Sequence, residues 1–131
     1  MTIELKMLAW TLVLAFAQIL LFDVARTGQY GLKWNTGPRD ESMPPLSARA
    51  ERLSRAQANL FETLPLFAGF VLIAHVADIH TAKTALGAQI YFYARVLYVP
   101  LYAFGVRNIR SLAWIVSIVG LVMLALPVLT A

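Results

Sequence analysis

Four long apolar stretches, separated by short polar segments, constrain this chain more than any other feature. A membrane-spanning helix needs about 20 predominantly apolar residues, because it rises about 1.5 Å per residue through a hydrocarbon core of about 30 Å. Only 14% of the 131 residues are charged, whereas soluble domains carry about a quarter. The sequence therefore predicts an all-α integral membrane protein, a single domain over residues 1–131 that forms an up-down bundle of four transmembrane helices. The predicted spans cover about residues 3–25, 48–78, 83–104 and 110–129.

The first stretch has a competing interpretation as a cleaved signal peptide, with a possible cleavage site at Ala15-Phe-Ala17. A signal peptide begins with a basic region and has an apolar core of about 7–15 residues. Glu4 interrupts the basic region, and the apolar run continues past the possible site to Phe22. We therefore expect a retained transmembrane helix.

The basic residues are distributed unevenly between the two sides of the predicted bundle. Loops one and three lie on one side of a four-span bundle, and both termini lie on the other. Because cytoplasmic loops are enriched in Lys and Arg, loops one and three are predicted to be cytoplasmic. The net charge of +4 then reflects membrane topology rather than a nucleic-acid partner. These loops and their flanks carry Arg26, Lys33, Arg39, Arg49, Arg52, Arg55, Arg107 and Arg110, whereas the other side has only Lys6 and Lys83.

Several kinds of chemistry are excluded by residues that the chain lacks. It has no cysteine, so neither a disulfide nor a protein thiol nucleophile is available. It has two histidines, which rules out a His-rich metal site, and no metal is expected. His75 is expected to be a helix-end residue and His80 a solvated loop residue.

A polar stripe interrupts the second apolar stretch. Arg55, Asn59 and Glu62 stand at positions i, i+4 and i+7, so a helix places them on one face. An isolated charge in a membrane span costs about 2.5–3.5 kcal/mol, so a partner for Glu62 is expected. The structural interpretation is an ion pair with Arg55 or Arg95 that locks the bundle, and the functional interpretation is a binding site.

A second polar stripe lies in the third stretch, where Arg95, Tyr98 and Tyr102 stand at i, i+3 and i+7. Counting about 1.5 Å per residue from the far ends of the spans places both stripes in the cytoplasmic half of the bilayer. Arg110 opens the fourth span nearby. The tyrosines also fit an ordinary interfacial aromatic belt, and the sequence leaves that alternative open.

The segment Arg55-Ala-Gln-Ala-Asn59-Leu-Phe-Glu62-Thr-Leu-Pro65-Leu-Phe resembles the second-helix signature of the MAPEG family, the membrane-associated proteins in eicosanoid and glutathione metabolism. Members of that family include microsomal glutathione transferases and leukotriene C4 synthase. The pattern Ala94-Arg95-Val-Leu-Tyr98-Val-Pro-Leu-Tyr102, followed by Arg107 and Arg110-Ser111, is similar to the family's third helix and the loop after it. The resemblance covers essentially the whole chain, which looks like a bacterial branch, so a bacterial inner membrane is the expected location.

The resemblance implies a homotrimer that binds glutathione between neighbouring subunits near the cytoplasmic face. Arg110 resembles the arginine proposed to activate the glutathione thiol, and Arg107 is a rival because the alignment needs a small gap there. One departure is Gly31, where relatives can carry a glutathione-binding arginine, and Lys33 or Arg26 could replace it. The residues implied to hold glutathione are Arg55, Gln57, Asn59, Glu62, Arg95, Tyr98 and Tyr102.

The function implied by this resemblance is that of a glutathione-dependent membrane enzyme, a transferase or a lipid hydroperoxide peroxidase. Its partners would be the bilayer, its own copies and a lipophilic electrophile or hydroperoxide. Two alternatives stay open at this point. One is a small proton-coupled multidrug transporter, since Glu62 is an intramembrane carboxylate. The other is a non-catalytic membrane scaffold that keeps the family fold.

Overall fold

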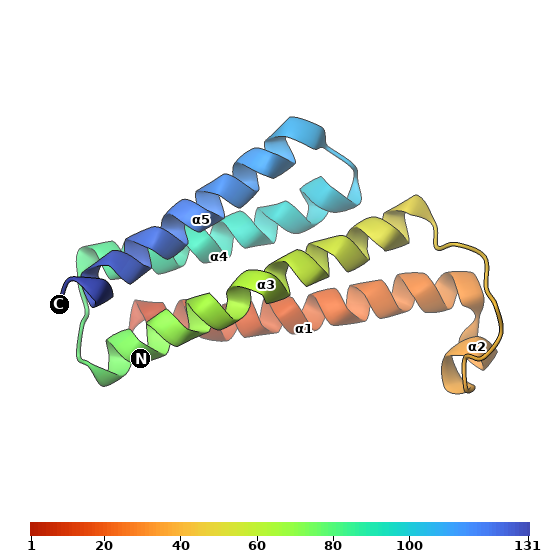
Figure 1. Cartoon of the computed structure of the whole chain (residues 1–131), viewed down its shortest axis with the longest axis horizontal. Helices are drawn as coiled ribbons and strands as arrows, with labels where there is room; N and C mark the ends of the chain where they lie inside the picture. The colour runs from red at the N-terminus through yellow and green to blue at the C-terminus, as the bar shows by residue number, and fades with distance from the viewer.

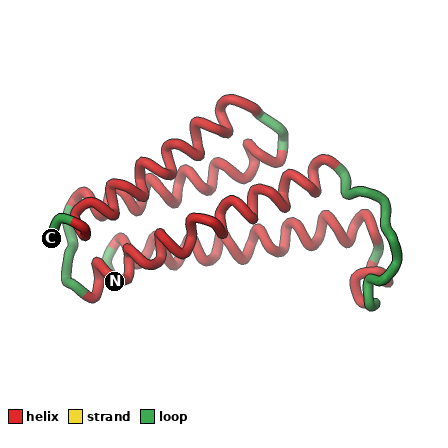
Figure 2. Tube along the Cα trace, viewed as in Figure 1, coloured by secondary structure: helices red, strands yellow, loops and turns green.

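The computed structural model describes all 131 residues and consists of helices joined by short connections (Figure 1, Figure 2). The all-α prediction is therefore confirmed. Four long helices carry the fold, and a short helix lies in the first loop. Their bounds are α1 Ile3–Tyr30, α2 Leu32–Thr36, α3 Ala48–Val76, α4 Ala82–Ala103 and α5 Arg107–Leu129.

The long helices form an up-down bundle made of two helical pairs (Figure 1). α1 lies along α3, and α4 packs most extensively against α5. The two termini and the α3–α4 turn lie at one end of the bundle. The first loop and the α4–α5 turn lie at the other end, which places the starts of α3 and α5 together with the last turn of α4.

Three helices, α1, α3 and α5, are long and apolar enough to cross a membrane. α4 has 22 residues, almost the same length as α5, but its polar stripe and tyrosines make it less apolar. Large apolar side chains on the outer faces are exposed, including Trp10, Phe16 and Leu97. Such a surface suits acyl chains, because a water-soluble monomer rarely exposes large contiguous apolar patches.

Two helix boundaries differ from the sequence-based prediction. α1 continues to Tyr30, about five residues beyond the predicted end of the first span near residue 25. It ends instead at Gly31, which has a φ of 95° and donates its N–H to the Thr27 carbonyl at 2.7 Å. A positive φ is inexpensive only for glycine, so the backbone of the first loop requires Gly31. α5 begins at Arg107, three residues before the predicted start of the fourth span, which places Arg110 inside its first turn.

The start of α3 is fixed by two side chains. Ser47 is the N-cap, and its side chain accepts a hydrogen bond from the Ala50 N–H at 3.2 Å. Gln29, near the end of α1, accepts from the Ser47 N–H at 2.7 Å and donates to the Pro45 carbonyl at 2.9 Å. These bonds join the end of the first loop to α1 and fix the residue at which α3 begins.

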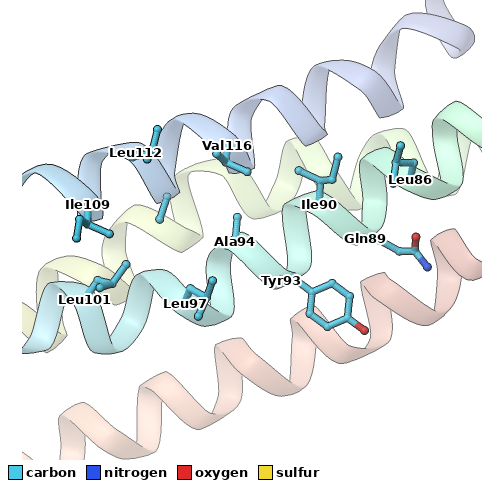
Figure 3. Close-up of a pocket in the computed structure, with 11 residues that line it drawn as sticks. Leu86, Gln89, Ile90, Tyr93, Ala94, Leu97, Leu101, Ile109, Leu112 and Val116 are labelled. Atoms are coloured by element: carbon cyan, nitrogen blue, oxygen red, sulfur yellow. The ribbon is translucent and has the colours of Figure 1, made fainter.

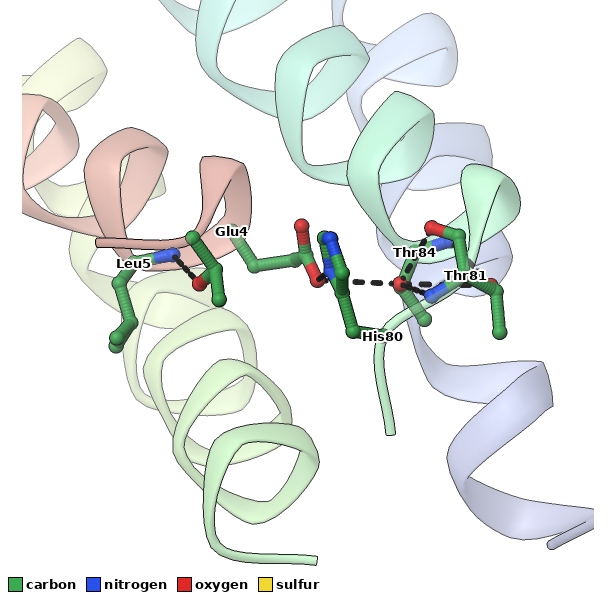
Figure 4. A network of polar contacts seen from close by, with 6 residues as sticks. Glu4, Leu5, His80, Thr81 and Thr84 are labelled. Carbon is green, nitrogen blue, oxygen red and sulfur yellow. Dashed lines mark hydrogen bonds and ion pairs between the residues drawn. The ribbon is translucent and has the colours of Figure 1, made fainter. Parts of the chain in front are cut away.

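At the opposite end of the bundle, the buried carboxylate of Glu4 joins α1 to the start of α4 (Figure 4). One of its oxygens accepts from the Thr84 hydroxyl at 3.2 Å and lies 2.5 Å from Nδ1 of His80. The expectation for His80 is therefore incomplete, since its half-exposed ring is bound to Glu4 rather than only solvated. Thr81 caps α4 beside this cluster.

We expect Glu4→Ala to lower the stability of the fold by about 1–3 kcal/mol, because it removes the buried partner of the His80 ring and leaves the Thr84 hydroxyl with only the Thr81 carbonyl as acceptor. Thermal unfolding of the purified protein in detergent measures this as a lower midpoint. Glu41→Ala is the matched control, since Glu41 is exposed in the first loop and forms no ion pair. Equal midpoints for the two variants would contradict the role given to Glu4.

Candidate functional site

The two polar stripes predicted from the sequence meet between α3 and α4. Nη1 of Arg95 donates to the side-chain oxygen of Asn59 at 2.8 Å. Arg95 is 1% exposed and is the largest fully buried side chain in the protein. Its guanidinium also lies over the ring of Tyr98, with 4.3 Å between the guanidinium carbon and the ring centroid. Cation–π contact and the Asn59 bond therefore hold Arg95 in one orientation.

Tyr102 is the meeting point of three helices, since it lies on α4 and contacts arginines from α3 and α5. Nε of Arg55 donates to its hydroxyl at 3.1 Å. The guanidinium of Arg110 lies over its ring at 4.4 Å. The rings of Tyr98 and Tyr102 meet edge to face at 5.5 Å. Tyr98 is 3% exposed and packs inside the bundle, which argues against an ordinary aromatic belt for this residue.

Two cavities lie against this cluster, and Arg110 lines both. The first has a volume of about 300 Å³ and is surrounded mainly by arginines. The second, of about 400 Å³, extends from the polar cluster to apolar side chains of α5. The first is lined by Arg52, Arg55, Tyr102, Gly105, Arg107 and Arg110. The second is lined by Asn59, Tyr98, Arg110, Ser111, Trp114 and Ile115.

The charge of this region suits an anionic ligand with a small polar body. Nε and Nη2 of Arg95 are buried and have no hydrogen-bond partner in the protein. An unsatisfied buried donor is costly, and a carboxylate is the acceptor that matches a guanidinium best. No acidic side chain lines either cavity, so the arginines there are not neutralised by the cavity walls.

Glu62 is on the same face of α3 but is exposed, and it forms no ion pair with Arg55 or Arg95. The interpretation of Glu62 as one half of a locking ion pair is therefore wrong within a single protomer. Arg55 pairs instead with Glu51, at 3.7 Å. Within the protomer, Glu62 is therefore an exposed carboxylate on a helix that is long and apolar enough to cross a membrane.

Some residues implied by the resemblance lie away from the cluster. Gln57 lines neither cavity and makes no side-chain hydrogen bond. Arg26 is bonded to Asp23 at 3.0 Å beside the ring of Trp34, and Lys33 lines a separate cavity in the first loop. Neither Arg26 nor Lys33 therefore reaches the cluster of its own protomer.

Two contributors to the site were missed from the sequence. Trp114 was not among the residues assigned to the site, but it lines the second cavity. Arg52 was expected only to set topology, but it lines the first cavity and bonds to the end of α4. The helical spacing of Arg52 and Arg55, three residues apart, is the signal that could have placed Arg52 near the site.

The largest apolar groove runs along the other side of α4 and α5 (Figure 3). It has a volume of about 600 Å³, and Gln89 is its only lining residue that is not hydrophobic. Leu97 and Leu101 face this groove, whereas Tyr98 and Tyr102 face the polar cluster. A groove of this composition can hold an acyl chain, but it has no charged group that could activate a thiol.

Comparison with known protein families gives one match. The family model described as "MAPEG family" matches residues 7–130, nearly the whole chain. No curated protein matches the chain.

Proposed function

The chain belongs to the MAPEG family of four-helix membrane proteins, and from this premise we propose that it is an enzyme that uses glutathione as a thiol co-substrate. The observation that carries the proposal is the Arg95–Asn59 hydrogen bond. It joins the two stripes and leaves two buried guanidinium nitrogens, Nε and Nη2 of Arg95, without an acceptor. A carboxylate of a soluble, amide-rich ligand would supply this acceptor, although Arg95 itself lines neither cavity in the protomer.

Glutathione has the functional groups that this cluster can bind. It carries two carboxylates, an ammonium group and two peptide units. Arg55 and Arg95 would bind the carboxylates, because a guanidinium pairs bidentately with a carboxylate. Asn59 would bind a peptide group, and the exposed carboxylate of Glu62 would accept the ammonium. Tyr98 and Tyr102 would complete the wall of the site.

Arg110 would stabilise the glutathione thiolate. A free thiol has a pKa of about 8.5, and a neighbouring cation favours its deprotonated form. In the transferase reaction the thiolate attacks an electrophilic carbon, a carbon–sulfur bond forms and the leaving group departs with its electron pair. In the peroxidase reaction two glutathione molecules reduce one hydroperoxide, giving glutathione disulfide, an alcohol and water. The apolar end of the second cavity, at Trp114 and Ile115, would admit the lipophilic reactant.

A homotrimer would complete the site. Glu62 and Arg55 are exposed in the protomer although they lie in a helix that can span the membrane. A neighbouring subunit that covers this face would remove both charges from lipid, and it would bring Gln57 to a glutathione molecule held between subunits. The basic ends of α3 and α5 would face the cytoplasm, with both termini on the opposite side of a bacterial inner membrane.

The first test is glutathione binding by isothermal titration calorimetry with the purified protein in detergent. We expect saturable binding, together with turnover of a chloronitrobenzene electrophile or of a lipid hydroperoxide. Ophthalmic acid, which replaces the thiol of glutathione by a methyl group, is expected to bind without reacting. The absence of any glutathione binding would end the proposal.

The same measurements address the two alternatives. Family membership favours the enzyme over a small multidrug transporter. Proton-coupled dye efflux from vesicles that is abolished by Glu62→Gln would reverse that preference. Glutathione binding without turnover of any electrophile or hydroperoxide would favour the non-catalytic scaffold.

A further inference from the structure

The last turn of α4 leaves the carbonyl of Ala103 without a backbone donor. The helix closes with the bonding pattern of a Schellman motif, in which the Val106 N–H donates to Leu101 and the Gly105 N–H donates to Tyr102, both at 3.0 Å. The Phe104 N–H donates to the Pro100 carbonyl, also at 3.0 Å. The carbonyl of Ala103 accepts none of these bonds, and Ala103 itself is buried.

Arg52 of α3 supplies the missing donor. Its Nε donates to the Ala103 carbonyl at 3.1 Å, across 51 residues of sequence. The last turn of α4 contains no basic residue of its own, so Arg52 also provides the positive charge that favours a helix C-terminus. The bond therefore joins the start of α3 to the turn that leads into α5.

The same guanidinium lies against Gly105, the residue with positive φ in that turn. A Cβ at Gly105 would stand 3.4 Å from both the guanidinium carbon and Nη1 of Arg52. Gly105 has a φ of 70°, so the turn reverses direction directly under the planar group. Arg107 and Arg110 follow within five residues and line the cavity that Arg52 also lines.

We propose that Arg52 is a positioning residue, which holds the α4–α5 turn so that Arg110 meets the bound thiol at the correct distance. This inference rests on the proposed function and adds a role that the family resemblance did not assign to Arg52. Arg52 acts through the Ala103 carbonyl and the turn, and it does not need to touch glutathione. A shift of about 1 Å at a reacting group can reduce turnover by about 100-fold. Loss of the Arg52–Ala103 hydrogen bond should therefore lower kcat.

The test compares Arg52→Ala, Arg52→Lys and Arg49→Ala with the wild-type protein. Arg49 is the matched control, since it is an exposed arginine one turn earlier that stacks on Phe104 of the same turn at 5.3 Å. We expect Arg52→Ala to bind glutathione within about threefold of the wild-type affinity and to lose about 10- to 100-fold in kcat, with a weaker ultraviolet absorbance of the bound thiolate. Arg52→Lys should recover part of kcat, because an ammonium can donate to the Ala103 carbonyl without the planar packing on Gly105.

Hydrogen exchange supplies a readout that does not depend on glutathione. Arg52→Ala is expected to accelerate amide exchange in residues 104–110, whereas Arg49→Ala is not. Unchanged exchange would overturn the inference, as would weaker glutathione binding with unchanged kcat, because Arg52 would then be a ligand contact. If the wild-type protein binds no glutathione, the proposed function and the catalytic role of Arg52 both fail, and exchange alone then decides whether Arg52 holds the turn.

Discussion

Replacing Arg110 by alanine is expected to lower kcat by about 100-fold or more while glutathione still binds, because one preorganised charge at a reacting anion is worth about that factor. Arg110 alone lines both cavities, and it is held over the ring of Tyr102 at 4.4 Å. The proposed anchors of the tripeptide, Arg55 and Arg95, are unchanged in the variant. Steady-state kinetics measure kcat, and calorimetry measures the affinity for glutathione. The absorbance of the bound thiolate reports whether the thiol is still deprotonated.

Arg107→Ala is the comparison that separates the two rival arginines. Arg107 lines only the arginine-rich cavity, and it is not among the residues that line the cavity at Asn59 and Tyr98. We expect its removal to reduce kcat less than the removal of Arg110, and Arg110→Lys to recover part of the activity. A larger loss in Arg107→Ala than in Arg110→Ala would exchange the two roles. Wild-type turnover in Arg110→Ala would remove Arg110 from the mechanism without affecting the glutathione-binding proposal.

The polar cluster was predictable because its spacing is a property of single helices. Residues three, four or seven positions apart must share a face of a helix, whatever surrounds it. Counting along the spans then placed both stripes in the cytoplasmic half of the bilayer, and the structure joins them through the 2.8 Å hydrogen bond between Arg95 and Asn59. The same reasoning could not determine which side chains pair. An ion pair of Glu62 with Arg55 or Arg95 was one expectation, but Arg55 pairs with Glu51 and Arg95 bonds to Asn59.

The contacts that join distant segments were not predictable in the same way. Glu4 and His80 are 76 residues apart, and Arg52 and Ala103 are 51 residues apart. No periodic pattern specifies either pair, because both depend on how the loops bring helix ends together. The family resemblance did not supply them, since it concerns the stripes rather than the caps. These pairs emerge only from the packed structure.

Two helices approach each other closely where Gly87 of α4 faces Gly120 of α5. A Cβ at Gly120 would stand 2.6 Å from the Tyr91 nitrogen and 2.7 Å from the Gly87 oxygen, and a Cβ at Gly87 would stand 2.6 Å from the Gly120 oxygen. These atoms belong to the backbone, so no side-chain rotation can relieve the overlap. In membranes, small residues at a helix interface permit the close packing that holds the helices together.

We therefore expect Gly120→Leu to separate α4 from α5 and to cost several kcal/mol of stability, more than the usual range of about 0.5–3 kcal/mol for single substitutions. Activity should fall as well, since Tyr98 and Tyr102 on α4 face Arg110 on α5 across the same helix pair. Thermal unfolding in detergent and size-exclusion chromatography measure the loss. Gly120→Ala should show a smaller effect in the same direction.

Gly69→Ala is the matched control for Gly120→Ala, because both change a glycine inside a long helix to the same residue. A Cβ at Gly69 meets no atom within 4 Å, so the substitution adds no overlap. Alanine is also the better helix former by about 1 kcal/mol, and Gly69→Ala should be neutral or stabilising. If both alanine variants unfold at the wild-type temperature, α4 and α5 do not approach as closely as described. The position of Arg110 relative to Tyr102 would then have to be supported by contacts other than this glycine pair.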